Sequence, residues 1–178
     1  MITKEQVTAG RRIAKELIEK SGLQVTAKEM DGLEVADFGL ENYPKEGAQI
    51  VSLLDTKKVG YKAICLSEGQ ILPEHMHTAS LGEEGKEETF RVVYGILRLF
   101  VPGEQGDVPC PVGKEQYYTC RKELRLGQTD QVTLPPDTPH WLMGGEGGCV
   151  VLSISSWARC TLDPFTDPNV IRETVIRE

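Results

Sequence analysis

Two histidines lie two residues apart in the segment LPEHMH, and a third follows a proline-rich turn in LPPDTPHW. These residues, His75, His77 and His140, are the only histidines in the chain. Because side chains alternate between the two faces of a β-strand, His75 and His77 on one strand would direct both imidazoles to the same point. Imidazoles that converge in this way bind divalent metal ions. The sequence therefore predicts a metal site, to which the fold must also bring His140.

A carboxylate from the acidic segment that follows is the expected fourth ligand, and its candidates are Glu83, Glu84, Glu87 and Glu88. If a strand that starts at residue 88 pairs with the histidine strand, Glu88 returns opposite the histidines. Glu88 would share one face of that strand with three largely apolar residues, Phe90, Val92 and Tyr94. Such a face is expected to line the interior of a barrel. We therefore predict that the metal ligands are His75, His77, Glu88 and His140.

Three imidazoles and one carboxylate, with no thiolate, suit a borderline divalent ion such as Mn, Fe, Co, Ni or Zn. An octahedral ion with four protein ligands keeps two adjacent positions for substrate oxygens. A compound with a carbonyl and a neighbouring hydroxyl could place both oxygens there, and Lewis-acid polarisation would make the adjacent proton removable. The ligand set is therefore compatible with proton-transfer chemistry on a carbonyl compound.

Lys62 and Glu74, which both precede the acidic segment, are candidates for the transfer of that proton. Lys62 lies in the segment VGYKAICL, where a lysine on an otherwise apolar strand must snorkel, form an ion pair or serve a site. We expect it to donate to a substrate oxygen or to exchange a proton. Glu74 precedes His75, so it is expected on the opposite face of the strand, where a supporting or solvated carboxylate is favoured.

Two further candidates lie later in the chain. Lys86, two residues before Glu88, would either bind a substrate hydroxyl at the edge of the loop or remain solvated. Asp163 and Asp167, in LDPFTDP, are expected to close the mouth of the barrel.

Composition and charge restrict the partners and the compartment. The chain has 178 residues, of which 39% are hydrophobic, which is enough for one domain with a sizeable core. A net charge of −7 argues against nucleic acid or an acidic membrane surface as a partner. The five cysteines are odd in number and form no Cys-x-x-Cys pair, which fits a reduced cytoplasm. The sequence has neither an apolar signal core nor an apolar run of about 18 residues, so we expect a soluble, unexported protein.

The pattern along the chain predicts one helix followed by many short strands. Residues 4–21 form an apolar stripe at helical spacing, with Thr3 and Gln6 spaced as a capping box and Gly22 as a stop. Strand-like segments follow at 49–54, 59–66, 70–77, 88–101, 116–120, 122–126, 130–134 and 148–157. This pattern is typical of an all-β sandwich or barrel. We expect a helical extension at 1–48, a barrel at 49–158 and a C-terminal tail at 159–178 that packs on the barrel.

The histidine segments resemble the two sequence motifs of cupins. Gly69-x5-His75-x-His77 followed by Glu88-x6-Gly95 is similar to the first motif, although ten residues rather than three or four separate His77 from Glu88. The segment 135–140 is similar to the second motif, with Asp137 in place of its glycine. Within cupins, LPEHMH followed by GKEETFRVVYG is most similar to the D-lyxose isomerase branch of sugar isomerases, as is FTDPNVIR at 165–172.

This resemblance implies a cupin fold, a double-stranded β-helix or jelly-roll-like barrel, preceded by a helix. It implies a cytoplasmic homodimer that uses manganese and acts on a monosaccharide. The reaction would interconvert D-lyxose with D-xylulose, and also D-mannose with D-fructose, through an enediol intermediate. Related isomerases carry a lysine thirteen residues before the first metal histidine, as Lys62 is here, and a Lys-x-Glu pair, as Lys86 and Glu88 are here.

Three other functions remain compatible with the sequence. An iron-dependent cupin dioxygenase would use the same ligand set but would require oxygen. A phosphosugar isomerase would need a cationic cradle for the phosphate, for which the motif strand offers only Arg91 and Arg98. A sugar- or metal-sensing module would bind its ligand without turnover.

Overall fold

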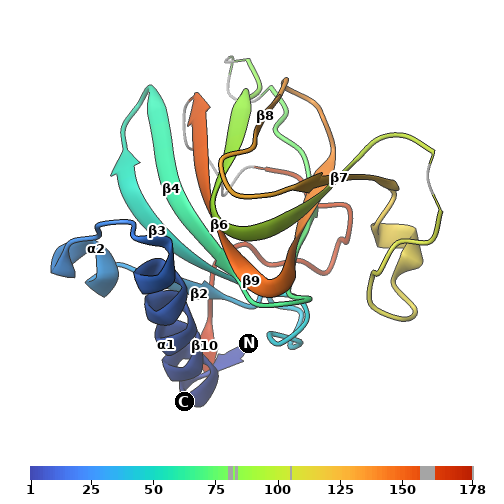
Figure 1. Ribbon diagram of the computed structural model, residues 1–178. Coiled ribbons are helices and arrows are strands. Elements are labelled where there is room, and N and C mark those ends of the chain that lie inside the picture. Colours follow the sequence, from blue (N-terminus) through green and yellow to red (C-terminus); the bar gives the residue numbers. More distant parts are fainter. Residues whose placement is uncertain (80–81, 83, 105, 157–162, 178) are drawn as a thin grey trace.

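A computed structural model describes residues 1–79, 82, 84–104, 106–156 and 163–177 of the protein. It consists of a β-barrel with one long helix against its outer side (Figure 1). The elements in chain order are β1 (Ile2–Thr3), α1 (Lys4–Ser21), α2 (Ala27–Asp31), β2 (Glu34–Ala36), β3 (Ala48–Asp55), β4 (Val59–Leu66), β5 (Ile71–His75), β6 (Glu88–Val101), η1 (Glu115–Tyr117), β7 (Lys122–Leu126), β8 (Gln131–Leu134), β9 (His140–Ser156) and β10 (Ile176–Arg177). Glu83, Cys160 and the expected boundary at 158/159 lie outside the described residues.

Helix α1 follows the sequence prediction at both ends. The Thr3 side chain accepts from the Gln6 backbone N–H, and the Gln6 side chain accepts from the Thr3 backbone N–H. Gly22 ends the helix in the left-handed conformation, at φ 71°. The buried face of α1 packs with residues of β3, β4 and β9 in a cluster outside the barrel. The helix is therefore a structural cover for the sheet.

The long strand β9 organises the sheet. The strands run in the order β2-β3-β4-β9-β6-β7, while β5 also pairs with β9 and β8 also pairs with β6. All of these pairings are antiparallel. The first half of β9 lies between β5 and β6 and its second half between β4 and β6. This arrangement confirms the predicted all-β cupin barrel with an N-terminal helix.

Two apolar clusters lie on opposite faces of the sheet. One is inside the barrel, and the other is the outer cluster that contains the buried face of α1. The interior cluster includes Phe90, Val92, Leu142 and Val151, and it forms the floor and walls of the barrel. A third cluster surrounds Trp141, whose ring stacks on Phe100 with centroids 3.7 Å apart. Trp141 is fully buried there, so it is a core residue.

Several predicted boundaries were wrong, and the cause in each case is tertiary. β5 ends at His75, β9 begins at His140, and the expected strand at 116–120 contains the short helix η1. The face assigned to Tyr94 was also wrong. A β-bulge between Val92 and Tyr94 shifts the register, so Tyr94 packs against the outer cluster near α1. A bulge inserts one residue and reverses the facing of every residue after it.

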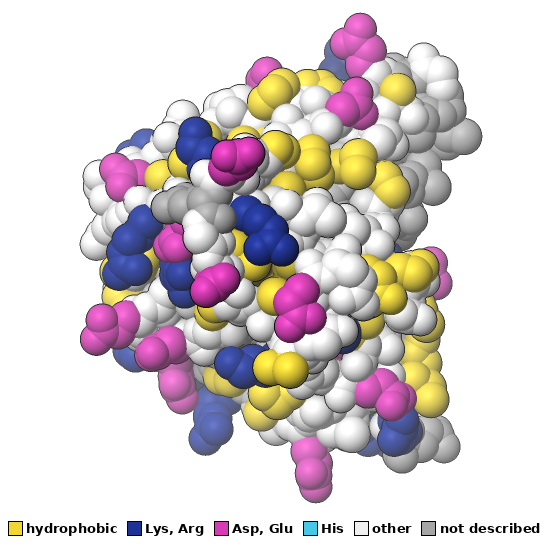
Figure 2. All heavy atoms as spheres, turned by 90° about the vertical axis from the view of Figure 1, so that its right-hand side faces the viewer, with side chains coloured by type: hydrophobic (Ala, Val, Ile, Leu, Met, Phe, Trp, Pro, Cys, Tyr) yellow, Lys and Arg dark blue, Asp and Glu magenta, His cyan; other side chains and the backbone are white. Residues whose placement is uncertain are grey.

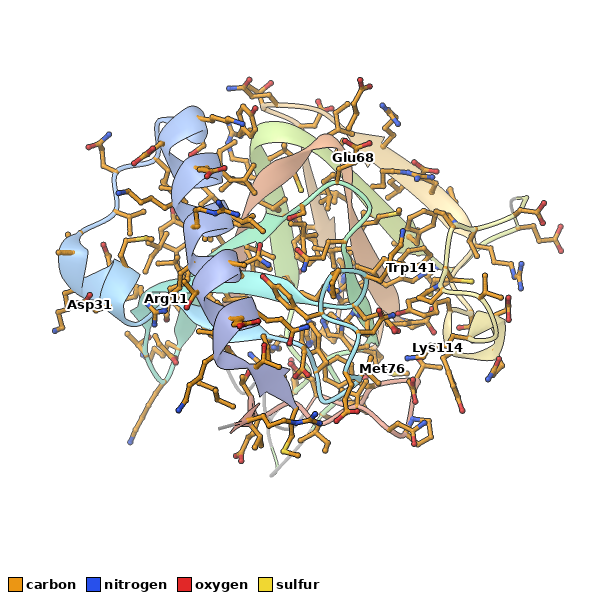
Figure 3. The ribbon with its side chains drawn as sticks, turned by 90° about the horizontal axis from the view of Figure 1, so that it is seen from below. Arg11, Asp31, Glu68, Met76, Lys114 and Trp141 are labelled. Atoms are coloured by element: carbon orange, nitrogen blue, oxygen red, sulfur yellow. The ribbon has the colours of Figure 1, made fainter. Side chains whose placement is uncertain are left out.

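Ion pairs of Lys114 help to fasten the arm between β6 and β7 to the barrel. Lys114 pairs with buried Glu46 at 2.8 Å and lies 3.5 Å from buried Asp167. Figure 3 shows Lys114 in the arm, and Arg11 on α1 near Asp31 at the end of α2. Arg11 donates to the backbone carbonyls of Met30, Asp31 and Leu33. Peripheral segments are thus held by cations that bridge elements distant in sequence.

The surface carries both signs of charge. On the face seen in Figure 2, lysine and arginine side chains alternate with aspartate and glutamate side chains, and no histidine is visible. All three histidines of the chain are buried. No helix within the described part of the chain is long and apolar enough to cross a membrane.

Gly95 allows β6 and β9 to approach closely, and its replacement should be costly. Gly95 has φ 72°, and a Cβ there would lie 2.0 Å from the carbonyl oxygen of Gly148. We expect Gly95→Ala to lower the free energy of unfolding by about 3 kcal/mol or more. Gly147 has φ 73° with nothing near its missing Cβ, so Gly147→Ala isolates the backbone penalty, about 1–2 kcal/mol. Urea unfolding measures the free energy of unfolding of both variants. An equal loss of this free energy in Gly95→Ala and Gly147→Ala would contradict the steric argument.

Candidate metal centre

The pairing of β5 with β9 brings the first and third histidines together. His75 at the end of β5 is the direct cross-strand partner of His140 at the start of β9. Their ring centroids are 4.4 Å apart, and both side chains are buried. The sequence had suggested that the histidine strand pairs with the strand that carries Glu88, but β5 pairs with β9 instead. The third histidine is therefore placed by backbone pairing.

His77 lies beyond the end of β5 and is held by its backbone. Its carbonyl accepts from the N–H of Asp137, a residue in the left-handed conformation at φ 60°. Met76, which separates the two histidines, donates its backbone N–H to Pro164 in the C-terminal segment (Figure 3). The His77 ring lies 5.0 Å from that of His75 and 5.2 Å from that of His140, centroid to centroid. All three imidazoles thus face one point.

Glu88 completes the cluster from the first residue of β6. Its Oε2 atom lies 2.5 Å from His77 Nε2 and 3.7 Å from His140 Nε2. Its Oε1 atom accepts a short hydrogen bond from the hydroxyl of Ser153 on β9. Of its predicted competitors, Glu84 and Glu87 are exposed. The structure brings together the four residues predicted from sequence.

The donor atoms fit a divalent metal ion. One ligand atom from each of His75, His77, Glu88 and His140 lies within 4.8 Å of the others, and all four residues are buried. The Nδ1 atoms of His75 and His140 lie 2.9 Å from the carbonyl oxygens of Pro73 and Thr138, so Nδ1–H donates and Nε2 keeps its lone pair for the cluster. The Nε2 atom of His140 is buried without a hydrogen-bond partner. A buried acceptor with no donor is unfavourable unless a cation is bound.

The pKa values of three ligating side chains are shifted, those of His75 and Glu88 downward and that of His77 upward. Burial and the neighbouring His140 and His77 lower the pKa of His75 well below its usual value. Burial alone would raise the pKa of Glu88, but His140 and His77 outweigh it and hold that pKa well below the usual range. Burial alone would lower the pKa of His77, but Asp163 and Glu88 raise it to about 9. Without a metal ion, His77 therefore holds the proton that balances Glu88.

His75, His77 and Glu88 of the cluster line a pocket with an empty volume of about 510 Å³ including its open mouth. Apolar residues form another part of the lining, namely Phe38, Ile50, Ile64, Leu72 and Phe165. Three cations, Lys62, Lys86 and Arg172, one further carboxylate, Asp163, and two serines, Ser153 and Ser155, supply its other polar groups. This combination of one apolar wall and a few convergent polar groups is typical of a small-molecule site.

Three of the predicted proton-handling residues line this pocket. Lys62 on β4 is the cross-strand neighbour of Ser153 on β9. Lys86 and Asp163 form a buried ion pair, with Nζ and Oδ2 2.7 Å apart. Asp163 Oδ1 also lies 3.0 Å from His77 Nδ1, without the alignment of a hydrogen bond. Burial alone would raise the pKa of Asp163, but His77 and Lys86 outweigh it and lower that pKa.

Glu74 and Asp167 are not brought to the pocket. Glu74 is buried, and its carboxylate accepts from the hydroxyls of Thr119 and Thr166 and from the backbone N–H of Cys120. Three donors therefore engage it away from the metal ligands, as expected for a supporting carboxylate and not for a catalytic one. Asp167 pairs with Lys114 instead of closing the mouth of the barrel, so that expectation was wrong.

The sequence reasoning missed Arg172, Phe38 and Phe165 as site residues. Arg172 lines the pocket and forms a bidentate ion pair with Glu34, at 2.6 and 3.1 Å. Phe165 stacks on His75, with ring centroids 5.3 Å apart. Both lie in the segment FTDPNVIR, which had been noted only as a family signature. That signature was the available signal, whereas nothing in the sequence around Phe38 indicated a pocket residue.

Metal binding is expected to release about one proton per ion near pH 7 to 8. The pKa of His77 is about 9, so its imidazole is protonated in the metal-free protein and must lose that proton to bind an ion. His75, with a lowered pKa, is already neutral, and Glu88 is already ionised. Affinity should thus rise with pH and level off above about 9. Calorimetric titration with Mn²⁺ in buffers of different ionisation enthalpy measures the proton, and a heat independent of the buffer would contradict this assignment.

The chain is similar in sequence to several sugar isomerases. No family model matches it. It is 41% identical over 164 residues to a D-lyxose ketol-isomerase from Cohnella laeviribosi, covering 90% of each chain. It is 38% identical over 175 residues to a D-lyxose/D-mannose isomerase from Thermosediminibacter oceani, covering 97% of each chain.

Solved structures show the same fold at much lower identity. The L-ribose isomerase of Cellulomonas parahominis superposes with a TM-score of 0.81 at 16% identity, over 99% of this chain and 98% of that one. The L-ribose isomerase of Acinetobacter sp. DL28, in complex with L-ribose, gives a TM-score of 0.82 at 17% identity over the same shares. The sequence relatives decide the family, and the chain accordingly belongs to the D-lyxose isomerase family, a family of aldose–ketose isomerases with a cupin-type barrel.

Proposed function

We propose that the protein is a metal-dependent isomerase that interconverts D-lyxose with D-xylulose, and also D-mannose with D-fructose, through an enediol. The observation that carries this proposal is the buried cluster of three histidines and Glu88, three of whose members line a pocket that also holds Lys62, Lys86 and Asp163. Relatives at 37–41% identity carry the names of isomerases acting on these sugars. Mn²⁺ is the proposed ion, and Fe, Co, Ni or Zn would suit the same donors.

The four ligands would hold the ion, which supplies Lewis-acid polarisation of the sugar carbonyl. Asp163 is the proposed base. It is the one carboxylate in the described pocket lining besides Glu88, and its lowered pKa keeps it ionised at neutral pH. Lys86 holds it through Oδ2 at 2.7 Å, and Oδ1 lies 3.0 Å from His77 Nδ1. Asp163 would move one proton between C1 and C2 of the sugar.

Lys62 and Arg172 are proposed to orient the substrate as hydrogen-bond donors. Lys62 extends from the inner side of β4, next to Ser153, and would donate to a sugar oxygen. Arg172 is held in place by Glu34 through two hydrogen bonds and lines the pocket, where it would donate to a hydroxyl oxygen of the sugar. The apolar wall formed by Phe38 and Phe165 would face the C–H side of the sugar and exclude water.

A phosphosugar is not favoured as the substrate. Two of the pocket cations, Lys86 and Arg172, are each neutralised by a carboxylate, and Arg91 and Arg98 do not line the pocket. Arg98 instead pairs with Glu123 outside the pocket.

Two assays separate the alternative enzymes. Activity on D-lyxose compared with activity on fructose 6-phosphate tests for a phosphosugar isomerase, and an assay without oxygen separates an isomerase from a dioxygenase. The homodimer expected from the family resemblance stays a prediction.

Incubation of the Mn²⁺-loaded protein with D-lyxose should yield D-xylulose. The conversion is measured by NMR of the sugar mixture. Removal of the ion by a chelator should abolish the conversion, and added Mn²⁺ should restore it. With D-lyxose deuterated at C2 in ordinary water, proton transfer by a base predicts loss of deuterium to the solvent. If the label is retained in full at C1, the enediol route is wrong. If the chelated and loaded forms behave alike, the metal-dependent mechanism is wrong.

Replacing the proposed base should lower turnover without preventing metal binding. Asp163→Asn keeps the shape of the side chain but removes the base, and we expect kcat to fall about 10²- to 10⁴-fold. Glu87→Gln is the matched control, because Glu87 is an exposed carboxylate next to a metal ligand and does not line the pocket. Its kcat should stay unchanged. Turnover by Asp163→Asn within a few-fold of the wild-type value would exclude Asp163 as the base.

A further inference from the structure

The two oxygens of Glu88 have different surroundings. Oε2 faces the histidines, 2.5 Å from His77 Nε2. Oε1 faces β9 and accepts a short hydrogen bond from the hydroxyl of Ser153. The carboxylate is therefore oriented with one oxygen inside the ligand cluster and the other engaged outside it.

Ser153 is placed for this contact by the pairing of three strands. It lies opposite Phe90 on β6 and opposite Lys62 on β4, while the direct partner of Glu88 on β9 is Ser155. The Ser153 residue is 4% exposed, at the point where the inward face of β9 changes from Val151 in the apolar core to hydroxyl side chains. A buried hydroxyl is unfavourable unless it forms a hydrogen bond, and Ser153 forms that bond with a metal ligand.

We propose that Ser153 is a positioning residue that restricts Glu88 to one-oxygen coordination of the metal ion. A carboxylate whose oxygens are both free can occupy two coordination positions. With Oε1 held by Ser153, three imidazoles and one oxygen occupy four positions of an octahedral ion. Two positions then remain for the substrate. This inference rests on the proposed metal-dependent function and adds the residue that keeps the coordination sphere open.

Ser155 provides a matched control on the same strand. It faces the same pocket, it is 7% exposed, and it is the residue directly opposite Glu88. The Oε1 atom of Glu88 is nevertheless bound to Ser153 and not to Ser155. Ser155→Ala therefore removes the same chemical group at nearly the same depth without removing the contact.

The test measures Mn²⁺ binding without any sugar, by calorimetric titration of the wild-type protein, Ser153→Ala, Ser153→Thr and Ser155→Ala. Loss of a group that orients a metal ligand typically weakens affinity about 10- to 100-fold, and we expect this for Ser153→Ala. Ser153→Thr keeps the hydroxyl and should bind within a few-fold of wild type, as should Ser155→Ala. Thermal unfolding of each metal-free variant shows whether the barrel is intact.

Absorption of the Co²⁺-substituted proteins provides a readout that a purely structural role would not change. The visible band reports coordination number, so it should change in Ser153→Ala and not in Ser155→Ala. Wild-type affinity and spectrum in Ser153→Ala would overturn the role of Ser153 while leaving the proposed isomerase intact. Absence of Mn²⁺ binding by the wild-type protein would overturn both the inference and the proposed function.

Discussion

The antiparallel pairing of β5 with β9 is the constraint on which the site depends. It sets His75 directly opposite His140, although the two residues come from distant parts of the chain. The same strand β9 pairs with β6, whose first residue is Glu88, and with β4, which carries Lys62. One strand thus positions site residues from three neighbours, and a shift of its register by one residue would turn its own side chains, His140 among them, away from the pocket.

Burying four ligating groups in an apolar barrel is unfavourable, and the cluster offsets the cost internally. The carboxylate of Glu88 is balanced by the proton that His77 retains, because both pKa values move toward the charged form. His75 remains neutral because burial and its neighbours disfavour a second positive charge. A divalent cation would replace that proton among the same donor atoms. The metal-free arrangement is therefore already preorganised for an ion.

The C-terminal segment closes the pocket through contacts that are long-range in sequence. Its backbone pairs with the end of β5, where Phe165 lies opposite His75 and Pro164 accepts from Met76. This pairing brings Asp163 beside Lys86, and the residues that follow bring Arg172 to Glu34. Pocket residues such as Phe38, Asp163 and Arg172 therefore come from segments outside the barrel strands, whereas the candidate metal ligands come from the barrel itself.

The sequence by itself determined the chemistry of the site and the local structure. Three histidines and one interior glutamate were identified from residue type and strand periodicity, and α1 was predicted from its caps and apolar stripe. Tertiary structure alone decided that β5 pairs with β9, that a bulge turns Tyr94 outward, and that Arg172 and Phe165 reach the pocket. The physical reason is the distance along the sequence between the residues that interact. Caps and side-chain alternation depend on neighbours a few residues away, whereas strand partners, bulges and tail docking depend on packing between segments that local sequence does not specify.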